Sequence, residues 1–451
     1  MTTNLWLKNA DAIFTACDQP ASGLVIADGK ISQVLTPGQS PTVQIHQQVD
    51  LSGCVVTPGL INTHHHFYQT LTRCLPQAIN KPLFPWLQTL YQVWQHITPE
   101  MLATASQLAA LELMSSGATT LGDHHYVFSQ QLAGAMDVQV SALKELGARL
   151  QLTRGSMSLG ESQGGLPPDS VIQDEQSILD DCQRVIAQYH QPGPGAMVQV
   201  ALAPCSPFSV TQELMQATAM LAEQSNVLTH THLAETEDEN DFCLRQYGLR
   251  PLDYLEQCGW LHNRTWLAHG IHFSDTEIKR LGTAGVGIAH CPSSNMLLAS
   301  GICPTLELQQ AGCAIGLAVD GSASNDCSNM IQEARQSLLQ QRLRYGAEKI
   351  TAETVLGFAT TGGAKLYQRN DIGTLEVGKQ ADLAIFKLDE MRFSGAGDPI
   401  AALVTCGAHQ VDRLMVAGQW QIIDGEHCTM DKQALIAKHQ ELAESLRRLA
   451  N

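Results

Sequence analysis

The sequence has little that would suit a membrane protein or a nucleic-acid-binding protein. Since no apolar run is long enough to span a bilayer, we expect no transmembrane segment. The first residues, MTTNLWLKNADAIF, have no basic segment followed by an apolar core, so we also expect no secretory signal. A formal net charge of −17 argues against nucleic acid or an anionic membrane as the partner.

The cysteines do not form the spacings of a disulfide framework or of a zinc-binding pair. There are 13 of them, an odd number, and no two form a CxxC pair. Reduced thiols in a cytoplasmic protein are the simplest interpretation. No G-x-G-x-x-G follows the first strand-like run, which disfavours a dinucleotide-binding oxidoreductase.

The chain does have a short apolar run that ends in a polar residue, and this pattern occurs eight times. The runs are PGLINTHHH, ATTLGDHH, LQLTR, MVQVALAPC, NVLTHTHLAE, TWLAH, VGIAH and AIGLAVD. The segments between them are long enough for a helix and its connections. Eight strand–helix units predict an α/β fold, a (β/α)8 TIM-like barrel with its reactive groups at the carboxyl ends of the strands.

The two ends of the chain have the pattern of short strands joined by turns. Strand-like runs occupy residues 5–8, 12–15, 23–27 and 31–35, with Asp28-Gly29 as a hairpin turn, and runs 381–387, 411–416 and 419–423 follow later. We therefore expect a small composite β-sandwich domain of residues 1–57 and 370–428 beside a catalytic barrel of residues 58–369. Helical periodicity in DKQALIAKHQELAESLRRLA predicts a C-terminal helix within residues 429–451.

The predicted strand ends hold imidazoles and carboxylates, the donors of a metal-assisted hydrolase site. His64 and His66 are two residues apart, so both point into the barrel mouth while His65 points away. His232 is a third candidate ligand, although His230 shares its face and the spacing cannot separate the two. Asp320 ends the eighth run as a ligand, a proton acceptor or a helix N-cap.

Two further residues at these strand ends suit proton transfer and charge stabilisation. Glu235 lies just past His232, where a carboxylate is better placed to move a proton than to bind the metal. His269 closes the sixth run, and in this company we interpret it as functional rather than structural.

Two long segments that follow strands are expected to border the substrate pocket. They are residues 74–98, with several Pro and Trp, and the Gly- and Ser-rich residues 156–168. Candidates to contact a substrate are side chains on loops or strand ends that face the barrel mouth: Gln69, Trp86, Tyr126, Arg154 and Cys205. Each has a structural alternative: Trp86 could be loop core, Cys205 could merely pack, and Arg154 could pair with an acid such as Glu161.

The ordered set PGLINTHHH, HTHLAE, WLAHG, AHCPSSN and VDGSASND resembles the amidohydrolase superfamily, in its aminohydrolase (deaminase) branch, over essentially the whole chain. The C-terminal IGTLEVGKQADLAIF resembles the return of that family into its β-sandwich. The resemblance implies metal ligands at His64, His66, His232 and Asp320, a proton shuttle at Glu235 and the strand-six histidine at His269. It also implies a homo-oligomer.

The fourth run ends in Cys205, where dinuclear members of the superfamily usually carry a carboxylated lysine. We therefore expect one divalent ion, Zn²⁺ by default, with Fe²⁺ or Mn²⁺ as alternatives.

Further segments, NTHHHFYQTLTR, PLFPWLQTLY, GDHHY, LTRGSMSLGE, GGLPP and LAPCSPFS, are similar to the group of aminohydrolases that convert 8-oxoguanine to uric acid. Isoxanthopterin deaminases and s-triazine aminohydrolases share parts of this pattern, and guanine is a further alternative substrate. An inactive barrel that only binds or assembles is disfavoured, because the four expected ligands and Glu235 are all present.

Overall fold

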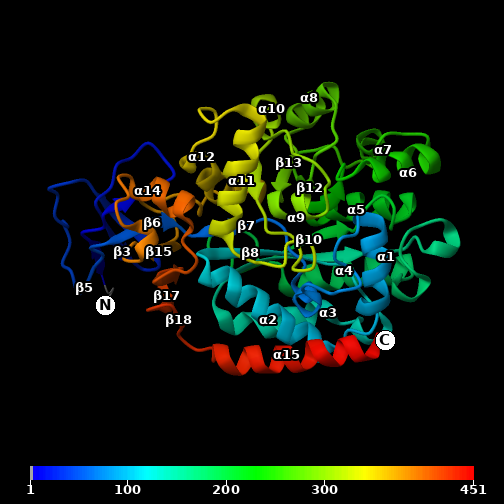
Figure 1. The fold of residues 1–451 in the computed structure, drawn as a ribbon, viewed down its shortest axis with the longest axis horizontal. Coiled ribbons are helices and arrows are strands. Elements are labelled where there is room, and N and C mark those ends of the chain that lie inside the picture. The colour runs from blue at the N-terminus through cyan, green and yellow to red at the C-terminus, as the bar shows by residue number, and fades with distance from the viewer. Residues whose placement is uncertain (1–3, 451) are drawn as a thin grey trace.

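The computed structural model describes residues 4–450, which form a large barrel beside a smaller β-rich unit (Figure 1). Eight strands form one parallel sheet in sequential order, and each coincides with one of the eight apolar runs. This confirms the predicted α/β barrel. The strands are β7 (Leu60–Asn62), β8 (Ala118–His125), β9 (Arg149–Ser156), β10 (Val198–Pro204), β11 (Thr229–Leu233), β12 (Thr265–His269), β13 (Gly287–His290) and β14 (Ile315–Leu317).

Hydrogen bonds join the segments that follow the first and last barrel strands. The Thr63 amide donates to the Leu317 carbonyl at 3.1 Å, and the Asp320 amide donates to the His64 carbonyl at 3.1 Å. The barrel therefore closes where two of the predicted metal ligands lie, which fixes the backbone of one relative to the other.

Helices surround the barrel, and several begin at a side-chain N-cap that satisfies a free amide of the first turn. These caps are Thr98, Asp174, Thr211, Ser274 and Asn329. The helices are α1 (Leu83–Trp94), α2 (Pro99–Ser115), α3 (Ala135–Leu143), α4 (Glu175–Tyr189), α5 (Gln212–Ser225), α6 (Glu237–Tyr247), α7 (Pro251–Gln257), α8 (Asp275–Ala284), α9 (Pro292–Leu297), α10 (Thr305–Ala311), α11 (Met330–Tyr345), α12 (Ala352–Gly357) and α13 (Gly363–Leu366).

The segment 74–98, predicted as a loop from its prolines, contains helix α1. Its prolines do not prevent the helix, because Pro82 is the N-cap and Pro85 lies in the first turn, where a missing amide costs no intrahelical hydrogen bond.

Both ends of the chain build the smaller unit, as the strand pattern predicted. One sheet has the order β4-β3-β1-β5, and the second has the order β18-β17-β16-β15-β6-β2, which mixes N-terminal with C-terminal strands. Leu7, Ile26, Val56, Leu383 and Met415 from both sheets share one apolar core. The strands are β1 (Leu5–Lys8), β2 (Ala12–Ile13), β3 (Gly23–Ala27), β4 (Lys30–Leu35), β5 (Gln47–Asp50), β6 (Cys54–Pro58), β15 (Leu383–Lys387), β16 (Arg413–Val416), β17 (Gln419–Ile423) and β18 (Glu426–His427).

The predicted hairpin at Asp28-Gly29 joins β3 to β4. Asp28 has a φ of 50° and Gly29 a φ of 74°, which are the left-handed conformations of a tight two-residue hairpin turn. A Cβ on Gly29 would lie 2.8 Å from the carbonyl oxygen of Ala417, so the contact between the two ends of the chain also requires glycine here.

After β15 the chain forms the short helix α14 (Pro399–Ala402), and it ends in the helix α15 (Lys432–Leu449), close to the expected range. Helix α15 leaves the β-rich unit and lies along α2 on the outside of the barrel (Figure 1). All 13 cysteines are free thiols. No helix within residues 4–450 is long and apolar enough to cross a lipid bilayer.

Candidate active site

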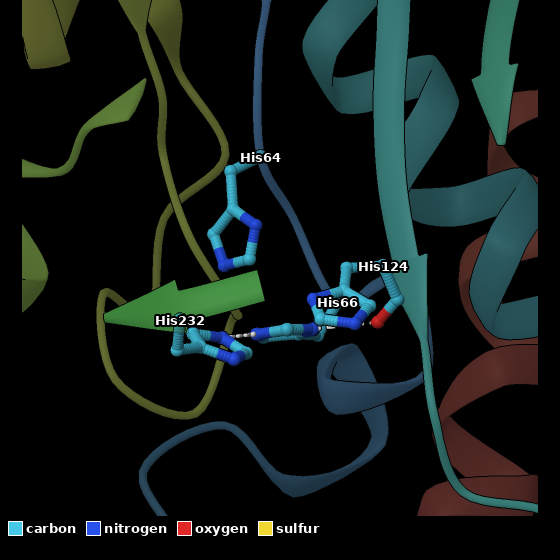
Figure 2. Close-up of side chains that lie close together, drawn as sticks. All are labelled: His64, His66, His124 and His232. Carbon is cyan, nitrogen blue, oxygen red and sulfur yellow. Dashed lines mark hydrogen bonds between the residues drawn. The ribbon is translucent and has the colours of Figure 1, made fainter. Parts of the chain in front are cut away.

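Three imidazoles and one carboxylate converge at the mouth of the barrel. The Nε2 atoms of His64 and His66 each lie 3.3 Å from Asp320 Oδ1, and the Nε2 atoms of His66 and His232 lie 3.2 Å apart. Figure 2 shows His66 and His232 edge to edge with His64 above them. All four side chains are buried.

The other ring nitrogen of each histidine is held by a hydrogen bond. His66 Nδ1 donates to the His124 carbonyl at 2.7 Å, and His232 Nδ1 donates to the Cys205 carbonyl at 2.7 Å. A carbonyl oxygen can only accept, so both Nδ1 atoms carry the proton and both Nε2 lone pairs face inward.

His230 settles the alternative that the spacing left open. Its Nδ1 donates to the Trp266 carbonyl at 2.9 Å, so its Nε2 accepts from His64 Nδ1 at 2.7 Å. His230 therefore lies behind His64 and turns the His64 Nε2 lone pair toward the centre. Of the two strand-five histidines, His232 is the one that faces the cluster.

The donor set fits a divalent ion. Tetrahedral ligands about 2.0–2.1 Å from zinc lie about 3.3–3.4 Å from one another, which agrees with the 3.2–3.3 Å separations here. The unprotonated Nε2 atoms of His66 and His232 would repel each other at 3.2 Å without a cation between them. Burial lowers the pKa of His232 to about 3, which keeps this ring neutral and able to bind metal.

Asp320 is an anion held by the cluster rather than a helix cap. Burial alone would raise its pKa, but the close contacts with the His64 and His66 imidazoles outweigh this and hold the pKa well below its usual value. The next barrel helix, α11, starts at Met330 with Asn329 as its N-cap. Asp320 has a φ of 61° and His269 a φ of 73°, left-handed conformations that non-glycine residues rarely adopt outside sites that require them.

Glu235 and His269 lie together beside the cluster. His269 Nε2 lies 3.4 Å from Glu235 Oε2 and 4.0 Å from Asp320 Oδ2. His269 Nδ1 donates to Asn295 Oδ1 at 2.9 Å, which directs Nε2 toward the carboxylates. Burial, reinforced by the charge of Asp320, raises the pKa of Glu235 to about 8, so this side chain holds a proton at neutral pH.

Glu239, four residues after Glu235, fixes the backbone that carries it. One carboxylate oxygen accepts from the Ala234 amide at 2.9 Å and the other from the Glu235 amide at 3.0 Å. Ala234 has a φ of 53°, so this pair of hydrogen bonds stabilises a strained turn. Burial raises the pKa of Glu239 to about 7.

The cluster opens onto a cavity of about 30 Å³. Four of the five predicted pocket residues line it: Gln69, Trp86, Tyr126 and Cys205, together with Leu83, Leu87, Phe208, Leu298 and Ser324. Gln69 Oε1 accepts from the Ala323 amide at 3.2 Å, which leaves its buried Nε2 without a partner. Trp86 Nε1 donates to the Ala323 carbonyl at 3.1 Å, so its ring offers a flat face rather than a hydrogen bond.

Arg154 lies elsewhere, although it ends the third run. Its guanidinium donates to Asp181 at 2.8 Å and to Gln173 at 3.0 Å, and it stacks over the Phe128 ring at 3.7 Å. It is thus ion-paired behind the barrel wall, with Asp181 rather than Glu161 as the acid.

The segment 156–168 also acts indirectly. Its Leu166 amide bonds to the Phe208 carbonyl at 3.0 Å, so the segment supports a residue that lines the cavity.

The sequence patterns do not single out His124, Asn295 or Glu239, and the spacing leaves His230 open. His124 lies within 4.8 Å of the ligand atoms of His64, His66 and His232, and its ring stacks on His232 with a centroid distance of 4.9 Å. The run GDHH contained the only signal for it, since a period of two places His124 and Gly122 on one face. Asn295 bonds to His269, 26 residues earlier in the chain. Glu239 bonds to the backbone of the strained turn at Ala234 and Glu235. Residue spacing in the sequence predicts neither contact.

Comparisons with known proteins place the chain among hydrolases and deaminases of similar sequence and fold. The chain is 60% identical over 442 residues to an 8-oxoguanine deaminase of Pseudomonas aeruginosa, covering 98% of each chain. It is 32% identical to an isoxanthopterin deaminase of an unknown prokaryotic organism, covering 83% of this chain and 82% of that one. The crystal structure of an atrazine chlorohydrolase from Arthrobacter aurescens, complexed with zinc, superposes with a TM-score of 0.91 at 30% identity, covering 97% of this chain and 100% of that one.

The sequence model of the amidohydrolase family matches residues 55–421, which include the whole barrel and every residue of the cluster. The match of the family model over most of the chain and the 60% identity to a curated relative show that the chain belongs to the amidohydrolase family.

Proposed function

We propose that this chain is a metal-dependent aminohydrolase that converts 8-oxoguanine and water to uric acid and ammonia. The observation that carries the proposal is the convergence of three Nε2 lone pairs and Asp320 beside a protonated Glu235. The 60% identity to an 8-oxoguanine deaminase supports the choice of substrate.

His64, His66, His232 and Asp320 would hold one divalent ion, with zinc as the first candidate. The zinc in the related atrazine chlorohydrolase and the separations of the ligand atoms support this choice. When bound, the ion supplies a Lewis acid that brings the pKa of a water molecule toward neutrality.

The side chains around the cluster would then move the protons of the reaction. Asp320 accepts a proton from the attacking water, and the water oxygen adds to the ring carbon that bears the amino group. Glu235, protonated at neutral pH, gives its proton to the neighbouring ring nitrogen. His269 lies beside both carboxylates, where it stabilises the developing charge on oxygen. The proton held by Asp320 passes to the amino group, which leaves as ammonia. As it leaves, Glu235 takes the proton of the new hydroxyl group, so a carbonyl forms and both carboxyl groups return to their starting states.

The wall of the cavity suits an uncharged planar ring. Burial raises the pKa of Cys205 to about 12 and that of Tyr126 well above its usual value, so both side chains stay neutral. The Nε2 group of Gln69 is a buried donor without a partner, suited to a ring carbonyl, and Trp86 offers a face for stacking. A buried donor of this kind favours a ring that presents a carbonyl there over one that lacks it.

The cavity as it stands has room for about one water molecule, so a purine enters only after the wall moves. Helix α1 carries Leu83, Trp86 and Leu87 of this wall, and the Trp86–Ala323 hydrogen bond ties it to the segment after β14. We infer that α1 moves outward to admit the substrate.

The first experiment tests the chemistry. Glu235→Gln should keep the bound ion and the fold but lower kcat by about 100-fold to 10,000-fold, since the carboxylic acid is the proton donor. Elemental analysis should find one ion per chain in both proteins. A variant within about tenfold of the parent, or two ions per chain in active protein, would contradict the assignment.

The second experiment tests the substrate. Ammonia release is measured for 8-oxoguanine, guanine, isoxanthopterin and a hydroxylated s-triazine, and kcat/KM should be highest for 8-oxoguanine. A preference for another ring would reject the substrate but leave the aminohydrolase chemistry standing, while no ammonia from any of them would reject both.

A further inference from the structure

A second, larger cavity lies on the side of the barrel, away from the metal ligands. It has a volume of about 530 Å³ and lies between the 3-10 turn η1 (Phe67–Thr72), helix α2 and helix α15. Figure 1 shows α15 lying along α2 in this region. We call it the α15 cleft. Its volume falls within the range of about 300–1,000 Å³ that is typical of small-molecule sites, whereas the catalytic cavity measures only about 30 Å³.

The charged side chains of the α15 cleft are mostly cationic. Arg73, Lys432 and Arg447 line it, against the single carboxylate of Glu112. Glu112 is ion-paired with Arg73, and Lys432 reaches the exposed Glu426 at 2.9 Å. Within the part of the chain that the structure describes, Arg447 has no ion pair. His439 is buried, and burial lowers its pKa to about 4, so it adds no charge at neutral pH.

The rest of the lining is largely apolar. Leu71, Leu108, Leu111 and Ala443 form part of the wall. Ile436 on α15 also lines the cleft, and its side chain is 42% exposed. A ligand that covered this side chain would be stabilised by the burial of apolar surface. Apolar walls with cationic side chains favour a molecule that carries both an apolar body and an anionic group.

The α15 cleft shares a wall with the catalytic site. Turn η1 carries Gln69 into the catalytic cavity and Thr70 and Leu71 into the α15 cleft. On the cleft side, a hydrogen bond of 3.0 Å between His439 Nε2 and Thr70 Oγ1 ties α15 to this turn.

Arg73 makes a second connection. It contacts Ser322 Oγ at 3.3 Å, two residues after Asp320. Ser322 Oγ lies 3.0 Å from Ser328 Oγ, which lies 2.8 Å from His65 Nε2, the residue between the first two candidate ligands. An anion that pairs with Arg73 would compete with Glu112 and Ser322, and would therefore disturb this chain of hydrogen bonds at its Arg73 end.

We propose that the α15 cleft is a regulatory site for a small organic anion with a ring-sized apolar body, and that its occupation lowers turnover through η1 and Arg73. The ligand is held by Arg447 and Arg73 at its anionic group and by Leu111 and Ile436 at its apolar body. The site is separate from the catalytic cavity, so effector and substrate can bind together.

The test uses 8-anilinonaphthalene-1-sulfonate, an aromatic sulfonate whose fluorescence rises on binding, with the metal-loaded full chain. We expect one saturable site per chain that an excess of uric acid does not displace. Arg447→Glu should weaken the affinity at least tenfold. Arg448→Glu is the matched control: it makes the same charge change one residue further along α15, on an exposed side chain outside the cleft, and should leave the affinity unchanged. Saturating dye should lower kcat/KM at least threefold in the parent and in Arg448→Glu, but not in Arg447→Glu.

Four results would overturn the proposal. Displacement of the dye by uric acid would place it in the catalytic cavity. Equal weakening in both variants would reduce the effect to overall charge. Tight binding without a change in kcat/KM would remove the regulatory role. A sedimentation coefficient that falls in Arg447→Glu alone, with dye affinity unchanged, would identify the cleft as an interface between copies of the chain.

Discussion

His230 should control metal affinity without touching the metal. Its ring accepts from His64 Nδ1 at 2.7 Å, donates to the Trp266 carbonyl at 2.9 Å and stacks on the Trp266 ring at a centroid distance of 4.3 Å. His230→Phe keeps a ring that can stack but removes both hydrogen bonds. His64 Nδ1–H then has no acceptor in a fully buried position, and the ring is free to adopt the tautomer that directs an N–H at the metal site.

Loss of such a supporting hydrogen bond typically costs about 10-fold to 100-fold in metal affinity, which corresponds to ~1.4–2.7 kcal/mol. The unsatisfied N–H adds ~1–3 kcal/mol of lost stability even without metal. Competition for zinc with a chromogenic chelator measures the affinity, and denaturant unfolding of the metal-free chain measures the stability.

His290→Phe is the matched control for this variant. His290 is a buried histidine at the end of β13, two strands away, and its Nε2 lies 3.4 Å from Gln341 Nε2, outside the cluster. The same substitution there should lower stability but leave the zinc affinity within about threefold of the parent. If His230→Phe also stays within threefold, or if both variants lose affinity equally, the role given to His230 is wrong.

Two further predictions follow from buried groups. Arg154→Met should leave kcat/KM within about threefold but lower the unfolding free energy by ~1–3 kcal/mol, because Asp181 loses a buried partner; a tenfold rise in KM would show that Arg154 contacts the substrate. Burial raises the pKa of Glu239 to about 7 from an ordinary value of 4.5, so the folded protein binds this proton more tightly than the unfolded chain does. The contribution of this proton to the free energy of unfolding is therefore fully present below about pH 4.5 and is lost as the pH rises through 7. Relative to the parent, Glu239→Gln should therefore gain stability between pH 5 and pH 8 in urea titrations, and a difference that does not change with pH would contradict this origin.

The sequence was sufficient to predict the barrel and the convergence of the four candidate metal ligands, because both depend on simple periodicities. Each apolar run became a strand, and the spacing of His64 and His66 put both rings on the inner face. The same periodicity could not separate His230 from His232, which also share a face. They differ in depth: His230 lies one layer deeper, behind His64, and only the three-dimensional structure shows that layer.

Arg154 shows a different limit of the sequence. In the barrel His124 pairs with Thr153 and His125 with Arg154, so Arg154 shares a face with His125 while His124 faces the cluster. Strands β8 and β9 are buried on both faces, by the barrel interior and by the helices. Neither strand therefore alternates between apolar and polar residues, and the sequence has no signal for which face is inside. The left-handed backbone at Asp320 and His269 is likewise set by the closed barrel and not by local propensity.

The mixed sheet of the small unit has a consequence for how the protein is made. Strand β15 lies between β6 and β16, and Phe386 pairs with Val55, about 330 residues earlier in the chain. At about 5–20 residues per second, a ribosome needs roughly 15–65 s to synthesise the missing partner. Throughout that time β6, whose five residues are all buried in the finished protein, has an unpaired edge. The growing chain thus exposes a strand with unpaired backbone hydrogen-bonding groups until synthesis is nearly complete. A nascent chain released before residue 387 would lack the partner of that edge and be prone to aggregate.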